Sequence, residues 1–304
     1  MNNGSKTSIV LTGSHRSGTT WVASVLRSAG GYILLEPMNI GIKHPYGWPA
    51  IVDEWYPLPE QSDMNTLNFH YRRLVSLQGD WHLALRESSS LKDLARVLRE
   101  YVRLVKARRN GCFPIIKDPF SLLLLNELEF PIRSVVLVRH PVAFVKSVLR
   151  KKWTYPLVSL KRKFDILGDR SSCANKAFSE NSHRLNDPVV NAALIWLFLH
   201  EQIAGMRGSA YLVRHEDLSI DPIINFQKLF EYLGLTMSEN SMEHIKRSTR
   251  GSTVTPDSNK THVLKRDSQK LAFSWRAQMP AEFIKTIREV AEPIASIFYS
   301  DDDW

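Results

Sequence analysis

The sequence predicts an α/β fold of three layers, αβα, with a mostly parallel central sheet. Short apolar runs alternate along the chain with segments of helical periodicity, which is typical of strands joined by crossover helices. The first apolar run leads directly into a glycine-bounded polar loop and then into an amphipathic helix. The 304 residues are 43% hydrophobic and show no break in composition, so we expect one large core in a single domain spanning residues 1–304.

Residues 9–30 combine a strand, an anion-binding loop and a helix. Residues 9–11 form the end of an apolar run, and residues 12–20 hold Gly13, Gly18 and five hydroxyl side chains, which leave the backbone N–H groups uncovered. From Trp21 onward apolar residues recur at helical spacing until the two glycines at 30–31. A phosphate group would therefore sit at the positive N-terminus of this helix.

The loop departs from the form that binds ATP or GTP. Gly13 and Gly18 match the spacing G-x-x-x-x-G-K-[ST], but Thr19 stands at the lysine position. That lysine spans the β- and γ-phosphates in nucleotide hydrolases and kinases, so its absence disfavours transfer of a terminal phosphoryl group. The cation lies inside the loop, at Arg16. A serine-rich turn before an ordinary helix remains the alternative.

The stretch GSHRSGTTW resembles the 5′-phosphosulfate loop of sulfotransferases that use 3′-phosphoadenosine-5′-phosphosulfate (PAPS). A second stretch, VVLVRHPVAFVKS, resembles the family's 3′-phosphate motif, with Arg139, Pro141 and Ser147. The resemblance implies that Arg139 and Ser147 hold the 3′-phosphate. It also implies that the loop binds the phosphosulfate through Arg16, Ser17, Gly18, Thr19, Thr20 and Trp21.

Composition limits the partners and the compartment. A net charge of +9 and a pI near 9.5 suit nucleic acid, an anionic surface or small anions, and the motifs select the small anions, so no nucleic-acid partner is expected. Two cysteines, Cys112 and Cys173, are too few for a disulfide framework and favour a reducing, cytoplasmic location. No export signal or membrane-spanning run is seen, and residues 189–199 are expected to form a core helix.

Glu36 follows the second predicted strand, residues 32–35, and precedes Pro37. Ligands of parallel sheets lie beyond the carboxyl ends of the strands, so this carboxylate could face the donor, or it could be a solvated strand-end residue. Carbohydrate and tyrosylprotein sulfotransferases carry a similarly placed glutamate, which in the carbohydrate enzymes is part of an EP pair. The resemblance implies that Glu36 is the catalytic base. It also implies that the chain is closer to these two types than to the cytosolic small-molecule type. Asp118, His15 and His44 compete for the role. His15 is expected to contact donor phosphate or solvent.

Two other strands end in cations. Residues 113–117 end in Lys117, which by resemblance lies near the transferring sulfonyl group, although an exposed strand-end lysine is the alternative. Residues 134–138 lead into Arg139 rather than the aspartate that holds magnesium in nucleotide hydrolases. Thr19 and Arg139 both depart from the pattern of nucleotide hydrolases, and both argue against magnesium-dependent phosphoryl transfer.

Two segments are candidates for acceptor-side insertions. Residues 38–62 are rich in proline and aromatics, and Trp48, Trp55 and Tyr56 would either stack on an acceptor or pack inside the protein. Residues 150–187 are basic, are expected to be irregular, and would recognise an acidic acceptor or form a solvated lid. Between them, residues 91–106 repeat apolar side chains at helical spacing, with basic residues on other faces as a solvated surface.

The C-terminal half supplies the remaining features. Asp187-Pro188 start a long helix whose His200-Glu201 lacks the H-E-x-x-H spacing, so no metal site is expected. After a strand at 210–213, His215 stands where relatives carry a tyrosine beside adenine, which implies a stacking role. The RKG motif of cytosolic members is absent, and the cations left to complete the 3′-phosphate site are Arg250, Lys265 and Arg266.

The resulting hypothesis is a PAPS-dependent sulfotransferase that moves a sulfonate to a hydroxyl or amine and leaves adenosine 3′,5′-bisphosphate, without a metal. A glycan, a lipid, a phenol and a small metabolite all remain open as acceptors, and the sequence leaves the oligomeric state open. The alternatives are a P-loop NTPase or kinase, which would need magnesium and ATP, and a non-catalytic nucleotide-binding module.

Overall fold

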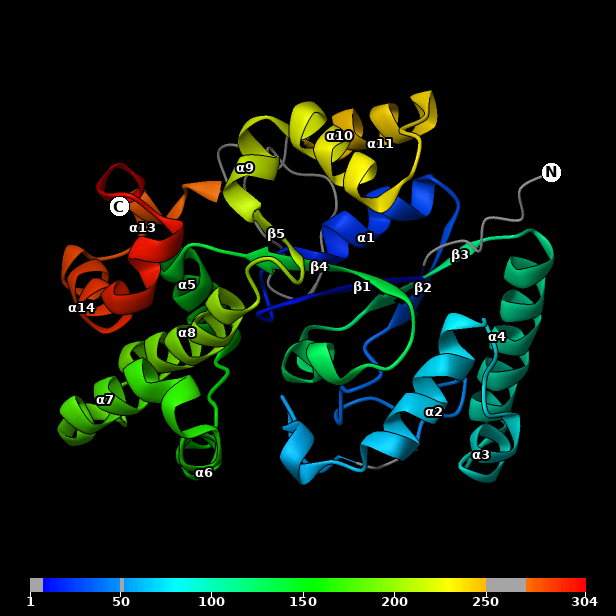
Figure 1. Cartoon of the computed structure of the whole chain (residues 1–304), viewed down its shortest axis with the longest axis horizontal. Coiled ribbons are helices and arrows are strands. Elements are labelled where there is room, and N and C mark those ends of the chain that lie inside the picture. Colours follow the sequence, from blue (N-terminus) through cyan, green and yellow to red (C-terminus); the bar gives the residue numbers. More distant parts are fainter. Residues whose placement is uncertain (1–7, 50–51, 250–271) are drawn as a thin grey trace. The chain divides into compact units, whose positions relative to one another are not determined.

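The computed structural model describes residues 8–49, 52–249 and 272–304. Its centre is a five-stranded parallel sheet with strand order β2-β3-β1-β4-β5, flanked by helices (Figure 1). The strands are β1 (Ser8–Gly13), β2 (Gly31–Leu35), β3 (Phe113–Lys117), β4 (Ile132–Val138) and β5 (Tyr211–Arg214). The predicted α/β class with a parallel sheet is confirmed. Arg250, Lys265 and Arg266 lie outside the described residues.

The chain divides into two compact units, and it passes from one to the other within β1, within the first helix and within β4. The first unit comprises Met1–Thr12 and Val22–Val135, and the second comprises Gly13–Trp21 and Val136–Trp304. The first helix, α1, spans Thr19–Ser28.

In the first unit β3 is paired with two parallel neighbours. Ile9 of β1 lies opposite Ile115, and Ile33 of β2 lies opposite the same residue on the other side. At Gly31, the first residue of β2, a Cβ atom would lie 2.3 Å from the Ile115 side chain and 2.8 Å from that of Phe113. Around this sheet lie α2 (Met64–Val75), α3 (Trp81–Arg86) and α4 (Leu91–Arg109), whose N-termini are capped by the side chains of Asp63, Asp80 and Ser90.

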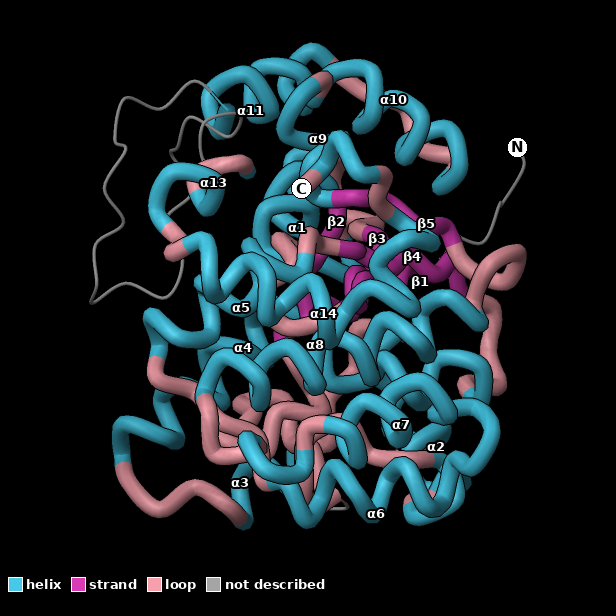
Figure 2. The backbone as a smooth tube through the Cα atoms, turned by 90° about the vertical axis from the view of Figure 1, so that its left-hand side faces the viewer, coloured by secondary structure: helices cyan, strands magenta, loops and turns pink. Residues whose placement is uncertain are grey.

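The second unit is mostly helical (Figure 2). Its centre is α8 (Pro188–Gly205), which starts at an Asp187 cap and is buried on nearly every side, because α5 (Pro141–Lys151), α7 (Ser172–Glu180) and α14 (Ala281–Phe298) all pack on it. The prediction that residues 189–199 form a core helix is confirmed. The other helices are α6 (Leu157–Leu167), α9 (His215–Ile220), α10 (Pro222–Leu233), α11 (Glu239–Thr249) and α13 (Trp275–Gln278).

One local expectation was wrong. Residues 150–187 are not irregular, since α6 and α7 and two short 3-10 turns occupy most of them. The leucine-rich segment after β3 forms a 3-10 helix, Pro119–Glu127. In α4 the buried side chains are Val97, Leu104 and Ala107, whereas much of the apolar repeat found in the sequence faces solvent. Which side of a helix is buried depends on neighbours that are distant in sequence.

Candidate functional site: a phosphate loop and a glutamate–lysine pair

In the second unit, the loop after β1 is shaped by two glycines. Gly13 has φ +133°, and a Cβ atom there would lie 2.3 Å from the Leu137 carbonyl oxygen, so only glycine lets the loop approach β4. Gly18 has φ +103°, and its Cβ would lie 2.5 Å from Nδ1 of His215. The loop therefore lies directly against the ends of β4 and β5.

Arg16 connects the loop to the second motif. Its Nε donates a hydrogen bond to Oγ of Ser147 over 2.9 Å, and Nη1 of Arg139 donates to the Arg16 carbonyl over 2.5 Å. Arg16 itself has φ +66°, a left-handed conformation that is strained for a residue with a side chain. The structure thus brings together the three residues that carry the two sequence motifs, although Ser147 lies 131 positions from Arg16.

Two hydroxyl groups of the loop can donate a hydrogen bond to a ligand. Oγ of Ser14 and Oγ of Ser17 are buried and have no hydrogen-bond partner among the described residues. A buried hydroxyl without a partner costs about 1–3 kcal/mol, and a ligand that accepts its hydrogen bond would recover this free energy. Together with the amides at the start of α1, the two hydroxyls make this loop a site for an anion.

Trp21 and His215 contact each other beside the loop. Their rings meet edge-to-face at 5.8 Å, and Trp21 also packs on Phe226 and donates its Nε1 proton to Oγ of Ser248 over 2.9 Å. Trp21 therefore joins α1 to α10 and α11. His215 begins α9 with its ring against Gly18 of the loop.

His15 is a neutral, packed side chain. Burial, with the charge of Arg16 as a second cause, lowers the pKa of His15 to about 3. Its ring lies 4.9 Å from Phe144 and 5.8 Å from Trp153. His15 is nevertheless partly exposed, so the expectation that it contacts donor phosphate or solvent stays a prediction.

The turn that carries Arg139 is anchored by His140 and Glu216. The His140 main-chain N–H donates to Glu216 Oε1 over 3.1 Å, and His140 Nδ1 accepts the Val142 N–H at the start of α5. Burial raises the pKa of the Glu216 carboxyl and lowers that of His140 to about 3. The Arg139 carbonyl accepts a hydrogen bond from Trp196 Nε1 at 2.8 Å. The peptide group between Arg139 and His140 is thereby held at both its carbonyl and its N–H.

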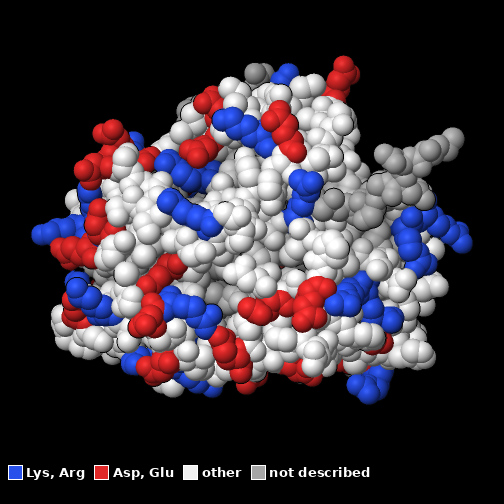
Figure 3. Space-filling view, in the orientation of Figure 1, with Lys and Arg blue, Asp and Glu red and all other residues white. Residues whose placement is uncertain are grey.

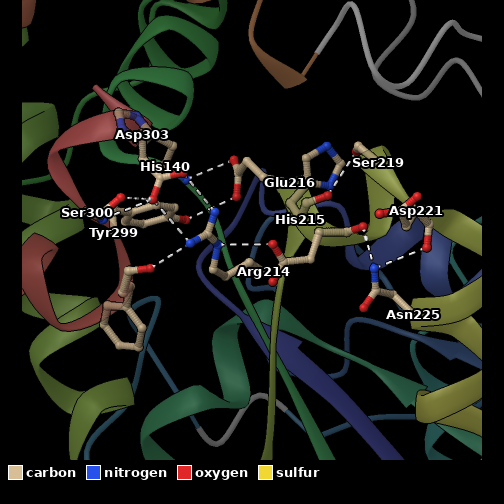
Figure 4. Close-up of polar contacts among 12 residues, drawn as sticks. His140, Arg214, His215, Glu216, Ser219, Asp221, Asn225, Tyr299, Ser300 and Asp303 are labelled. Carbon is tan, nitrogen blue, oxygen red and sulfur yellow. Dashed lines mark hydrogen bonds and ion pairs between the residues drawn. The ribbon is translucent and has the colours of Figure 1, made fainter.

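The C-terminal residues complete this anchor (Figure 4). The Tyr299 hydroxyl donates to Glu216 Oε2 over 3.1 Å, and its ring lies under the Arg214 guanidinium at 4.7 Å. Arg214 in turn holds both carboxylate oxygens of Asp303, at 3.0 and 3.3 Å. The sequence analysis missed this cluster because its members lie up to 163 positions apart, and only an Arg or Glu at a strand end could have indicated it.

In the first unit, Glu36 and Lys117 form an ion pair at the ends of neighbouring strands. Lys117 Nζ donates to Glu36 Oε1, and the two side chains are only 3% and 16% exposed. Glu36 has φ +47°, and its N–H donates to the Lys117 carbonyl over 2.8 Å. Asn39, which the sequence analysis missed, donates Nδ2 to Glu36 Oε2 over 2.7 Å. Its position three residues after Glu36, in the turn that begins there, was the available signal.

Two competitors for the base have structural roles. Both oxygens of Asp118 accept backbone N–H groups, from Met38 at 2.6 Å and from Phe120 at 2.9 Å, while burial above all raises its pKa to about 7. His44 is buried, which lowers its pKa to about 4, and its Nδ1 shares a hydrogen bond with the Tyr46 hydroxyl at 3.0 Å. Both oxygens of Asp118 are therefore occupied by backbone donors, while Nε2 of His44 has no hydrogen-bond partner among the described residues, so the choice between Glu36 and His44 as the base stays a prediction.

The aromatic residues of 38–62 pack inside the first unit. Trp48 and Tyr56 are 6% and 2% exposed, and Trp48 meets Tyr71 edge-to-face at 5.0 Å. Trp55 stacks on Phe120 with the rings 5.4 Å apart. The packing alternative therefore holds for these side chains.

Within the described ranges, no group of three or more His, Cys, Asp or Glu could hold a metal ion. No helix there is long and apolar enough to cross a membrane. Cys112 and Cys173 are both free thiols.

Comparison with known proteins identifies the relatives. Carbohydrate sulfotransferase 1 of Danio rerio is 32% identical over 89 residues, which cover 29% of this chain and 21% of that protein. Carbohydrate sulfotransferase 3 of Mus musculus is 22% identical over 186 residues, or 61% of this chain and 35% of that protein. Over these segments the chain is similar to carbohydrate sulfotransferases. The matches span about a fifth to a third of the length of these relatives. No model of a known protein family matches.

A solved structure supports the fold. The sulfotransferase domain from the curacin biosynthetic pathway superposes with a TM-score of 0.50 over 95% of this chain and 97% of that domain, at 14% identity. This likeness supports the fold, an α/β architecture with a parallel central sheet.

Proposed function

We propose that this protein is a sulfotransferase that moves the sulfonate of PAPS to a hydroxyl of an acceptor, or to an amine, and releases adenosine 3′,5′-bisphosphate. The observation that carries the proposal is the convergence of Arg16, Arg139 and Ser147 on a glycine-shaped loop that has Thr19 in place of the phosphoryl-transfer lysine. The carbohydrate sulfotransferase relatives support it.

The second unit would bind the donor. The loop amides, with Ser14, Ser17, Thr19 and Thr20, would hold the 5′-phosphosulfate at the N-terminus of α1, where the helix dipole favours an anion. Arg139 and Ser147 would hold the 3′-phosphate by charge-assisted hydrogen bonds. His215 would lie against the adenine. The residues present fit such a ligand, because they offer several donors and two guanidinium groups.

The first unit would activate the acceptor. Glu36 and Lys117 stand at the carboxyl ends of β2 and β3, where parallel folds bind ligands, and we propose that they act on the acceptor hydroxyl. Glu36 takes the proton of the acceptor hydroxyl as the new oxygen–sulfur bond forms and the bond from sulfur to the donor phosphate breaks. Once protonated, Glu36 no longer holds Lys117 by charge. The ammonium group is then free to stabilise the negative charge on the sulfonate and the leaving phosphate.

A phosphoryl-transfer enzyme is the rival reading. It would need a lysine where Thr19 stands and a metal-binding carboxylate where Arg139 stands. The relatives' names make a sugar hydroxyl the first acceptor to examine.

Two measurements test the proposal. Radiolabelled PAPS incubated with a panel of glycans and with a metabolite extract is expected to label an acceptor, and the Glu36→Gln protein to label it far less. In a thermal shift assay, adenosine 3′,5′-bisphosphate without magnesium is expected to stabilise the protein by roughly 2.7 kcal/mol at about 100 times its Kd. Equal stabilisation by magnesium-ATP, together with phosphate but not sulfonate transfer, would favour the rival. Stabilisation by the bisphosphate without any transfer from PAPS would indicate a non-catalytic nucleotide-binding module.

A further inference from the structure

Helix α4 turns an apolar row toward solvent. Leu91, Leu98 and Val102 are 86%, 54% and 62% exposed, and Ala95 between them is also exposed. Their spacing of i, i+4, i+7 and i+11 places all four on one face of the helix. A different row of the helix, with Val97 and Leu104, is buried against the core. An ordinary surface helix buries its apolar stripe and exposes a polar one, so this second apolar row is left without a protein partner in the described part of the chain.

A basic row runs beside the apolar row. It consists of Lys92, Arg99, Arg103 and Lys106, which directly follow Leu91, Leu98, Val102 and Val105 in the chain and are all exposed. Over its whole length α4 carries seven Lys and Arg against two acidic residues. Figure 3 shows Lys and Arg side chains, in blue, at the right-hand edge of the view, where Figure 1 places α4.

An aromatic residue flanks the apolar row on its other side. Tyr101 is 45% exposed and its ring meets Trp81 of α3 edge-to-face at 4.9 Å. Tyrosine and tryptophan rings suit a boundary between an apolar and an aqueous medium, because each joins an apolar body to a polar tip. The face thus has an apolar centre, a cationic side and an aromatic side.

The charge and the apolar row of this face of α4 together favour one class of binding partner. Nucleic acid or another soluble polyanion would satisfy the basic row but would leave Leu91, Leu98 and Val102 in water. A second copy packed through the same face would bring one basic row close to another, which like-charge repulsion opposes. An anionic lipid surface satisfies both rows, since its headgroups pair with the cations and its acyl boundary receives the leucines and valine.

We propose that the outer face of α4 docks this protein on an anionic membrane surface. The helix lies in the plane of the headgroups, with the row Leu91, Ala95, Leu98 and Val102 inserted at the acyl boundary and the row Lys92, Arg99, Arg103 and Lys106 paired with lipid phosphates or carboxylates. The proposal rests on α4 alone and does not depend on the sulfotransferase activity.

Vesicle sedimentation tests the docking. The full chain is incubated with phosphatidylcholine vesicles, with or without about a third phosphatidylserine, and we expect it to pellet only with the anionic vesicles. Each lysine or arginine beside such a surface is worth about fivefold in partitioning, so Arg99→Gln with Lys106→Gln should lower the partition constant roughly 30-fold. Leu98→Gln with Val102→Gln should lower it by about tenfold or more. Glutamine retains helix propensity, and all four sites are exposed, so the variants should fold.

Matched controls lie on other helices. Val158, 84% exposed on α6, provides the apolar control Val158→Gln, and Lys176, 77% exposed on α7, provides the charge control Lys176→Gln. Both should partition as the parent does. The proposal is overturned if the protein does not pellet with anionic vesicles or if Leu98→Gln with Val102→Gln changes nothing, which would mean a purely electrostatic polyanion surface. It is also overturned if α4 variants convert a stable dimer to a monomer in light scattering, which would assign the face to a second copy.

Discussion

Three groups hold Glu36 in place. Lys117 pairs with one carboxylate oxygen, Asn39 donates to the other, and the left-handed backbone at Glu36 is fixed by its N–H bond to the Lys117 carbonyl. Strained residues persist when their surroundings over-determine them, and they cluster at functional sites. Asp118, the nearest competitor along the chain, instead uses both oxygens to hold backbone amides.

Replacement of Glu36 by glutamine tests its role as the base. Glu36→Gln keeps the shape but cannot take the proton, so turnover should fall by about two to four orders of magnitude while affinity for adenosine 3′,5′-bisphosphate is retained. Steady-state rates and calorimetry with the bisphosphate measure the two quantities. Glu129→Gln, an exposed position in the same unit, serves as the control. If Glu36→Gln remains within a few-fold of the parent while His44→Ala is inactive and still binds donor, the base is His44.

Arg139 is predicted to contribute to donor binding rather than to the chemical step. Arg139→Ala should weaken bisphosphate binding by about 1.5–3 kcal/mol, the range for a hydrogen bond to a charged group, and Ser147→Ala by less. Calorimetry gives the affinities, and Arg247→Ala on the exposed side of α11 is the matched control. Unchanged affinity in a folded Arg139→Ala protein would reduce Arg139 to a structural link between β4 and the loop.

At the scale of elements, the C-terminal segment after α14 supports the turn between β4 and α5. Tyr299, Asp303 and Trp304 converge on His140 and Arg214, and the His140 ring stacks on Trp275 at 4.5 Å with an interplanar angle of 9°. The segment therefore supports the proposed 3′-phosphate site indirectly. Tyr299 bonds Glu216, and Glu216 accepts the N–H of His140, the residue after Arg139.

Loss of the Tyr299 hydroxyl should loosen this support. Tyr299→Phe keeps the ring under Arg214 but leaves Glu216 Oε2 without that donor, which should lower the free energy of unfolding by about 1–3 kcal/mol. Because Glu216 positions the turn that carries Arg139, the KM for PAPS should rise several-fold while the KM for the acceptor stays constant. Tyr211→Phe, an aromatic of β5 stacked on Tyr232, is the control. Equal changes in both KM values would indicate a general loss of structure.

At the scale of the whole molecule, buried histidines make stability depend on pH. His200 is fully buried inside α8, its Nδ1 bonds the Trp196 carbonyl at 2.8 Å, and burial lowers its pKa to about 3. Its folded-state pKa is below the unfolded value of about 6.5, so between these values the unfolded chain binds the extra proton. The stability that neutral His200 provides is thus full above pH of about 6.5 and is lost as pH falls toward about 3. The raised pKa of Asp118 acts in the opposite direction.

Comparison with His200→Phe isolates this histidine. Between pH of about 7 and 5, the parent should lose roughly 2 kcal/mol more than the variant, because the contribution of Asp118 is common to both proteins and cancels. Urea unfolding at the two pH values measures the difference. Parallel pH profiles would show that His200 is not the group that titrates.

The sequence alone determined the features that depend on local pattern. The order of strand, loop and helix around Gly13 and Gly18 follows from residues adjacent in the chain, as does the placement of Glu36, Lys117 and Arg139 at strand ends. Helix α8 was predictable because an apolar run long enough to be buried on all sides follows an Asp-Pro start. The family resemblance rested on the same short motifs.

Only the tertiary structure decided which side chains meet. Lys117 reaches Glu36, His215 lies against Gly18, and Tyr299 reaches Glu216 because strand pairing and helix packing bring these positions together. Tertiary packing also decides which face of a helix is buried. Helix α4 has two apolar rows, and packing against the rest of its unit buries Val97 and Leu104 and leaves Leu91 and Leu98 in solvent. Periodicity specifies that a helix has an apolar face, whereas contacts between distant segments select the face that is buried.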